Sequence, residues 1–526
     1  MARMPSVMQH DFSRVPKAEI PRSSFDRSHG HKTSFNSGYL IPVWCDEVLP
    51  GDTFSLSMTA FARLATPLFP IMDNMYINSF FFFVPYRLLW INFQKFMGEQ
   101  VDPDDSTDYL IPHMVATAGT GLVANSIYDY LKLPVGIPGF EFSALPLRAY
   151  NLIWNEWFRD QNMQDSLVVH RDDGPDPVSD YALQRRGKRH DYFTSALPWP
   201  QKGEAVDIPL GGAAPIVGIG TINSTGAPVA SVRETGGITR NYAEAQNMNT
   251  GNTVIEMTAA TAAFPAVYAN LSEATGATIN QLRQAFAIQK LLERDARGGT
   301  RYTEIIRAHF NVTSPDARLQ RPEYLGGGQA TVAFHTVPQT SSTDAQPTPQ
   351  GNLSAYSTTV ASGHGFTKSF TEHGVLLGMV AVRADINYQQ GLQRMWSRKT
   401  KYDFYWPALS HIGEQAILNK EIYCQGTSDD ELAFGYQERF AEYRYYPSAI
   451  TGELRSSFPQ SLDAWHLAQD FAALPALNAA FIEDRPPVDR IIVVENEPQF
   501  ICDMYFKLRC ARPMPLYGVP GQMDRF

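Results

Sequence analysis

The sequence predicts a mainly β protein, in which a β-sandwich carries very long loops between its strands. Apolar and polar residues alternate in segments 53–58 and 499–511, near the two ends of the chain, which is typical of half-buried strands. A continuous apolar run at Phe80–Val84 indicates a strand covered on both faces. The 37 glycines and 36 prolines are spread along all 526 residues, so turns and loops are frequent. Strands at both ends with long excursions between them favour a sandwich that the C-terminal strand completes.

Residues 1–36 are predicted to form an irregular arm, because prolines interrupt them and no apolar period is present. Cations outnumber acids in this arm. Its candidate DNA-facing residues are Arg3, Arg14 and Lys17. The alternative is a disordered terminus that contacts nothing. Residues 37–526 are predicted to form one domain with a variable surface insertion at about 204–270.

The next segments are predicted to be strands. Leu40–Trp44 is rich in β-forming residues, and a turn at Pro50–Asp52 separates it from the alternating segment 53–58. The long apolar run that begins at Tyr76 ends at Pro85, which removes a donor from the ladder. We therefore expect three consecutive strands in the first part of the domain.

Two amphipathic helices and one buried strand are predicted further along. Large apolar residues from Leu147 to Phe158 recur at helical spacing and share one face. The same holds from Gln281 to Arg297, and the glycine pair that follows is a common C-terminal stop. The apolar run Val375–Val382 has the length and composition of a central strand. The helices are assigned to the loops between strands.

Residues 204–270 differ from their surroundings, since they are rich in Gly, Thr, Ser, Asn and Ala and sparse in charge. Short β-like pieces such as Ile216–Val217 stand between the glycines. Loops longer than about 15 residues are usually functional or disordered, so this segment is predicted to be displayed on the surface. Residues 336–352 form a second low-complexity loop.

Bulk composition limits the class of protein. The net charge of −10 argues against a free-standing nucleic-acid binder, so DNA contacts must come from local patches. A charged fraction of 19% with 12% aromatic residues suits extensive contact with other chains. The four scattered cysteines fit free thiols in a reducing compartment. We expect neither a signal peptide nor membrane insertion, because the apolar runs are short.

The sequence shows no pattern of catalytic or cofactor-binding residues. Gly326–Gly328 lacks the Lys-Ser/Thr of a phosphate-binding loop, and no nucleophile elbow or paired-histidine zinc motif occurs. The acidic loops 102–108 and 172–176 offer clustered oxygens that suit calcium. Neither matches an EF-hand, so solvated turns are favoured. We predict no catalytic residue, no metal and no cofactor.

Two basic clusters are candidates for nucleic-acid binding. Cluster 185–190 holds mainly cations, whereas cluster 394–401 interleaves cations with an aromatic residue, as proteins that bind single strands do. The second cluster is therefore the stronger candidate. A solvated face or an intersubunit salt-bridge patch is the alternative for both. The candidate DNA-facing residues here are Arg394, Trp396, Arg398, Lys399 and Lys401.

The stretch 434–446 is rich in Tyr and Arg, the residue types that dominate interface hot spots. An ordinary strand pair at the edge of the core is an equally acceptable interpretation. The candidate intersubunit residues are Tyr436, Arg439, Tyr443, Arg444, Tyr445 and Tyr446.

Several long strings of residues resemble the major capsid proteins of microviruses. The strings are Gly51–Phe54, Ser79–Arg87 leading to Phe93–Met97, and Glu372–Arg383. The segments similar to the gokushovirus branch are Thr278–Tyr302 and Ser314–Tyr324. These matches cover most of the chain from about residue 38 to the end, and only the insertion 204–270 departs from the shared strings.

The resemblance implies an eight-stranded antiparallel jelly-roll β-sandwich whose loops contain helices. It implies a structural virion protein of a bacteriophage, not an enzyme, made in the host bacterial cytoplasm and self-assembled into a T=1 icosahedral shell around circular single-stranded DNA. Implied partners are a DNA pilot protein, an internal scaffolding protein, a small basic DNA-binding protein and a host cell surface receptor. The insertion is expected to form three-fold protrusions for attachment. Its surface candidates are Thr225, Arg233, Arg240, Tyr242 and Asn249.

The alternative hypothesis is a carbohydrate-binding or carbohydrate-active β-sandwich protein. Its hallmark would be two carboxylates flanking a cleft, and the sequence alone places no such pair. Turnover of a glycan that is lost on mutation of one Asp or Glu would favour this alternative.

Overall fold

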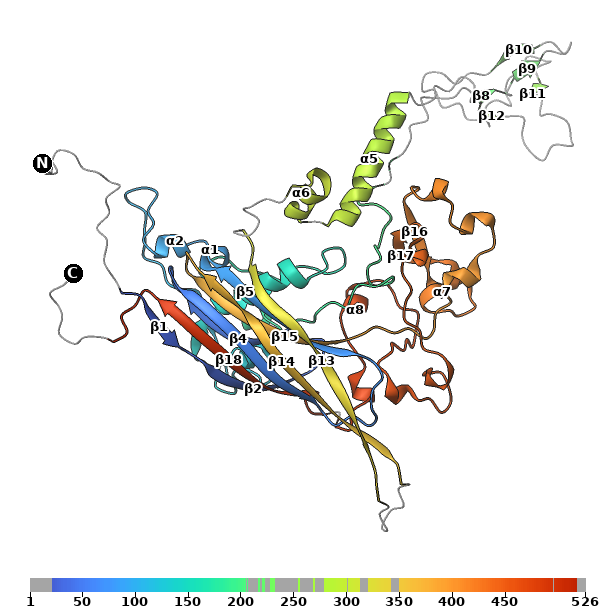
Figure 1. Cartoon of the computed structure of the whole chain (residues 1–526). Helices are drawn as coiled ribbons and strands as arrows, with labels where there is room; N and C mark the ends of the chain where they lie inside the picture. The colour runs from blue at the N-terminus through green and yellow to red at the C-terminus, as the bar shows by residue number, and fades with distance from the viewer. Residues whose placement is uncertain are drawn as a thin grey trace, which may run out of the picture. The chain divides into compact units, whose positions relative to one another are not determined.

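In the computed structural model (Figure 1) the chain divides into two compact units, one of residues 1–200 with 299–526 and one of residues 201–298. The residues that the structure describes are 21–204, 206, 216–217, 220–222, 228–231, 254–255, 268–269, 279–299, 301–312, 320–341, 350–494 and 496–517. The three arm candidates Arg3, Arg14 and Lys17 lie outside them.

A nine-stranded antiparallel sheet forms the body of the larger unit (Figure 1). Its long strands are β2 (His29–Phe35), β3 (Ile41–Val48), β4 (Thr53–Leu64), β5 (Met75–Pro85), β13 (Glu323–Pro338), β14 (Leu353–Ser369), β15 (Gly374–Ala384) and β18 (Phe500–Arg512). One half of the sheet has the order β2-β18-β4-β14, and the other has the order β3-β15-β5-β13. The β13–β14 hairpin joins the halves, and the short β1 (Ser23–Asp26) extends the edge beside β18.

The mainly β prediction is confirmed. Each half of the sheet interleaves strands from the beginning and the end of the chain, an order consistent with the predicted jelly-roll sandwich. Trp44 and Phe81 from one half meet Phe366 and Phe506 from the other, with the Trp44 ring centroid 6.2 Å from Phe366 and 6.4 Å from Phe506. Each such buried side chain contributes about 1.5–3 kcal/mol, so this contact stabilises the packing of the halves.

Burial follows the predicted patterns in three strands. In β18 buried and exposed residues alternate from Phe500 to Cys510, as the alternating sequence predicts. The apolar runs in β5 and β15 are buried almost throughout, and β15 lies between β5 and β3. These continuous apolar runs therefore mark strands with protein on both faces.

The glycine cluster Gly326–Gly328 lies in strand β13, where space rather than ligand binding requires glycine. A β carbon on Gly327 would stand 2.0 Å from the carbonyl oxygen of Ser79 on the neighbouring strand. On β14, a β carbon on Gly365 would stand 1.9 Å from the carbonyl oxygen of Leu56. Both glycines therefore allow close approach of backbones.

The predicted irregular arm contains regular structure at residues 23–26 and 29–35, which form β1 and β2. Both strands hydrogen-bond to β18. Of the residues in β2 only Phe35 is buried, and apart from the His29–Phe506 and Phe35–Phe500 ring contacts the strand is bound mainly through its backbone and carries no apolar period. A prediction based on apolar periodicity could not detect them.

The first predicted helix is confirmed as α4 (Leu145–Ile153), which continues as a π-helical turn at Trp154–Phe158. Helix α6 (Tyr302–Phe310) was not predicted. Shorter elements of the larger unit are α1 (Tyr86–Leu89), α2 (Phe93–Phe96), α3 (Ile127–Tyr130), α7 (Asn419–Ile422), α8 (Ala479–Ile482), β6 (His113–Val115), β7 (Glu141–Ser143), β16 (Glu414–Leu418) and β17 (Ala433–Glu438).

The smaller unit contains the second predicted helix, α5 (Ile279–Gly298). Its short strands are β8 (Ile216–Val217), β9 (Gly220–Ile222), β10 (Pro228–Ser231), β11 (Val254–Ile255) and β12 (Tyr268–Ala269), which form a three-stranded and a two-stranded antiparallel sheet. The insertion candidates Thr225, Arg233, Arg240, Tyr242 and Asn249 lie outside the described residues. Among the helices described, none is long and apolar enough to cross a bilayer.

Candidate functional site

Cluster 394–401 and the stretch 434–446 come together on one surface of the larger unit. The second segment begins in strand β17, which pairs with β16. Each segment also contains one 3₁₀ turn, at Arg394–Ser397 in the first and at Ala441–Tyr443 in the second. A cavity of about 360 Å³ is bounded by both segments. Two DNA-facing candidates, Trp396 and Arg398, and two intersubunit candidates, Tyr445 and Tyr446, therefore line the same cavity.

Exposed aromatic side chains crowd this site. We name as the aromatic surface the residues Trp396, Tyr402, Phe404, Tyr405, Trp406, Tyr443, Tyr445 and Tyr446. Tyr446 is 77% exposed and Trp396 is 70% exposed. The rings of Tyr405 and Tyr443 are 6.3 Å apart, and the Tyr446 hydroxyl accepts a hydrogen bond from Gln393 at 2.8 Å. Exposed apolar groups gathered in this way mark an interaction surface.

Two of the DNA-facing candidates are already neutralised by acids. Arg394 Nη1 lies 2.9 Å from Glu421 Oε1, and Arg398 Nη2 lies 3.5 Å from Glu442 Oε1. The Arg398 guanidinium also lies 4.5 Å from the centre of the Tyr443 ring. Burial raises the pKa of Glu421, and the charge of Arg394 opposes that rise. These arginines therefore support the local structure.

Lys399 and Lys401 differ from the two arginines. Both are exposed, and neither forms an ion pair with any residue in the described part of the chain. The Lys401 ammonium lies 5.0 Å from the centre of the Tyr402 ring. With exposed Trp396 nearby in sequence, these lysines keep the pattern of cations and aromatic faces that suits a single strand.

The intersubunit candidates also fall into two groups. Tyr443, Tyr445 and Tyr446 are exposed, whereas Tyr436 is half-buried and its backbone exchanges 2.8 Å hydrogen bonds with Leu197. Arg439 packs over Phe440, and Arg444 is ion-paired with Glu438. The three exposed tyrosines are therefore the ones available to a neighbour.

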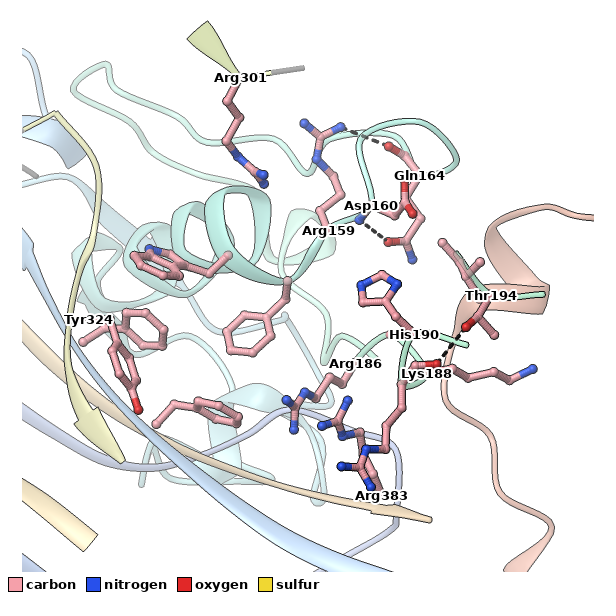
Figure 2. A pocket seen from close by; sticks show the side chains of 17 residues that line it. Arg159, Asp160, Gln164, Arg186, Lys188, His190, Thr194, Arg301, Tyr324 and Arg383 are labelled. Atoms are coloured by element: carbon pink, nitrogen blue, oxygen red, sulfur yellow. Dashed lines mark hydrogen bonds between the residues drawn. The ribbon is translucent and has the colours of Figure 1, made fainter. Parts of the chain in front are cut away.

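Residues 186–190 of the other basic cluster, 185–190, line a separate pocket of about 700 Å³ (Figure 2). Arginines from distant segments complete this pocket, namely Arg159, Arg301 and Arg383. No sequence pattern indicated these three, because only the tertiary structure brings their segments together. We name this site the arginine pocket.

One acidic loop contributes to a group of possible metal ligands. Ligand atoms of His170, Asp172 and Asp176 lie within 4.8 Å of one another. Both carboxylate oxygens of Asp176 accept hydrogen bonds from Arg148, at 2.8 and 2.6 Å, and one also accepts from Tyr181. Asp176, the most buried of the three possible ligands, is therefore already paired with the buried Arg148.

Comparison with known proteins covers almost the whole chain. Residues 13–522 match a family model described as capsid protein (F protein). The chain is 50% identical over 530 residues to "Capsid protein VP1" of Bdellovibrio phage phiMH2K, covering 98% of both chains. It is 44% identical over 591 residues to "Capsid protein VP1" of Chlamydia phage 1, covering 99% of this chain and 98% of the relative. It is 38% identical over 539 residues to "Capsid protein VP1" of Spiroplasma virus 4, covering 97% of both.

Proposed function

The chain belongs to the capsid protein (F protein) family, and from this premise we propose that its copies self-assemble into a T=1 icosahedral shell around circular single-stranded DNA. It is a structural major capsid protein of the virion, not an enzyme. The predicted resemblance to gokushovirus-like microviruses is confirmed. A family match over residues 13–522 favours this function over the carbohydrate-active alternative.

The exposed tyrosines of the aromatic surface, Tyr443, Tyr445 and Tyr446, are the proposed contact with a second copy of the chain. Exposed Tyr and Trp are the residues that interface cores favour, and they lose little side-chain entropy when they dock. Tyr445 and Tyr446 line a cavity of about 360 Å³ that an apolar side chain of a neighbour would fill, and exposed Tyr443 belongs to the same aromatic surface. This concentration of exposed rings is the structural observation that carries the proposal.

Assembly of the purified chain tests the proposal. We expect hollow particles by electron microscopy, and fewer of them for Tyr446→Ala and Tyr445→Ala. Tyr302→Ala is the matched control, because Tyr302 is 76% exposed and lies outside the aromatic surface. A stable monomer in light scattering, even with the other virion proteins present, would contradict shell formation. Equal assembly of all three variants would contradict the role of the aromatic surface.

The proposed DNA contacts of the shell are Lys399, Lys401 and Trp396, with Arg3, Arg14 and Lys17 of the arm. A chain of net charge −10 needs further cations to package DNA, and a small basic DNA-binding protein is the proposed source. A DNA pilot protein and an internal scaffolding protein are the other proposed partners. We propose that synthesis and assembly take place in the cytoplasm of the bacterial host.

The insertion at about 204–270 is proposed to form the three-fold protrusions that contact a host cell surface receptor. Support comes from its composition and from the separate compact unit formed by residues 201–298. Deletion of the insertion is expected to leave the sandwich folded and to reduce attachment to host cells. Unchanged infectivity after deletion would argue against this role.

A further inference from the structure

The arginine pocket contains more positive charge than the proposed function uses. Among the described residues that line it, six are lysine or arginine and one, Asp160, is an acid. In Figure 2 Arg186 and Arg383 point into the same space, with Arg159 and Arg301 on the other side and Tyr324 on the aromatic side. The volume of about 700 Å³ lies within the range of small-molecule sites.

Three of these cations already have partners. Arg189 Nη1 lies 2.6 Å from Asp385 Oδ1. Arg301 lies 3.0 Å from Glu304 and 3.4 Å from Glu156. The Lys188 ammonium donates to Gln469 at 3.3 Å and lies 4.4 Å from the centre of the Phe481 ring. The positive charge available to a ligand therefore belongs to the other arginines.

Arg186 and Arg383 have no ion pair within the described part of the chain. Arg186 donates to the side-chain oxygen of Asn78 at 3.0 Å, and the buried Nε of Arg383 has no hydrogen-bond partner there. Burial, together with the charge of Arg383, lowers the pKa of Arg186 to about 9. The one carboxylate that acts on both is Asp484, and burial raises its own pKa to about 7. An anion placed between the two guanidiniums would relieve this unbalanced charge.

Aromatic rings form the wall beside these arginines. The Arg186 guanidinium lies 4.6 Å from the centre of the Phe80 ring and 6.0 Å from that of Phe158. Further out, the rings of Trp157 and Tyr324 are 6.0 Å apart and are 39% and 43% exposed. A flat ring bound here would stack or pack edge-on against aromatic faces.

We propose that the arginine pocket binds one nucleotide, with its phosphate between Arg186 and Arg383 and its base against Trp157 and Tyr324. Guanidinium groups donate paired hydrogen bonds to phosphate oxygens, and the neighbouring rings can stack with any base. The site therefore selects a nucleoside phosphate without selecting the identity of its base. The nucleotide comes either from a DNA strand or from a free mononucleotide. The site lies within one subunit and does not depend on shell assembly.

Calorimetric titration of the purified chain with thymidine 5′-monophosphate tests the site. We expect tighter binding of this nucleotide than of inorganic phosphate or of thymidine. Arg186→Gln and Arg383→Gln should each weaken binding about tenfold or more, because each removes a charge-assisted hydrogen bond. Tyr324→Leu should weaken binding of the nucleotide and leave binding of inorganic phosphate unchanged. Arg189→Gln is the matched control, since Arg189 lines the same pocket but is paired with Asp385.

Thermal unfolding separates loss of binding from loss of folding. The nucleotide should raise the melting temperature of the wild type and of Arg189→Gln by the same amount, and raise that of Arg186→Gln by less. Competition by a thymidine decanucleotide would identify a DNA strand as the source, and failure to compete would identify a free nucleotide. Thymidine binding as tightly as its monophosphate, or full binding by Arg186→Gln, would overturn the proposal.

Discussion

Replacing Arg148 by methionine should destabilise the larger unit more than any surface substitution. The Arg148 side chain is fully buried and donates to both oxygens of Asp176, and also to the carbonyl oxygens of Leu89 at 3.1 Å and Asp172 at 2.9 Å. The variant leaves the Asp176 carboxylate buried with Tyr181 as its remaining hydrogen-bond donor. Breaking a buried pair in this way costs about 3–5 kcal/mol.

Urea unfolding of the purified chain, followed by tryptophan fluorescence, measures this loss. Arg27→Met is the matched control, because Arg27 forms the same two-pronged pair with Asp46 at a position 38% exposed, where about 1 kcal/mol or less is expected. The double variant Arg148→Met with Asp176→Leu should recover most of the loss, since it leaves no unpaired buried charge. Equal losses for Arg148→Met and Arg27→Met, or a double variant as unstable as the sum of its singles, would refute the reasoning.

The remaining predictions concern charge, pH and strand packing. Replacing Lys399 and Lys401 by glutamine should weaken single-stranded DNA binding and flatten the slope of log K against log salt by about 1.4 for two lost phosphate contacts, measured by fluorescence anisotropy. Burial raises the folded-state pKa of Asp484 to about 7, above its unfolded value of about 3.9, so its contribution is fully present below pH 4 and is lost as the pH rises through 7. Asp484→Asn should therefore reduce the difference in unfolding free energy between pH 5 and pH 8, and an unchanged difference would exclude this assignment. Gly365→Val should abolish soluble folded protein in expression trials, because even a β carbon meets the Leu56 carbonyl oxygen.

The strands that are buried through their side chains were predictable from the sequence. The alternation in β18 and the continuous apolar runs of β5 and β15 identify these strands because burial imposes the pattern. Strand β2 was missed because it is bound to β18 mainly through backbone hydrogen bonds and two ring contacts, His29 with Phe506 and Phe35 with Phe500, which leave no apolar period in the sequence.

The candidate binding residues were predictable only as local clusters. Sequence showed that cations and aromatic rings alternate around Trp396, but it could not show that Glu421 neutralises Arg394 from a segment more than twenty positions away. The arginine pocket escaped detection for the same reason, since Arg159, Arg301 and Arg383 share no segment with Arg186. Ion pairs between distant segments decide which cations remain free, and these pairs follow from topology.

The position of β18 inside the sheet has a consequence for synthesis. This strand pairs with β4 on one side and with β1 and β2 on the other, although more than 400 residues separate it from them. A nascent chain on the ribosome therefore holds both neighbours without their shared partner until residues 500–512 have been translated. Such distant pairing is slow, and the open edges it leaves attract other strands in the meantime. We expect newly made subunits to need protection by a chaperone before they become competent to associate.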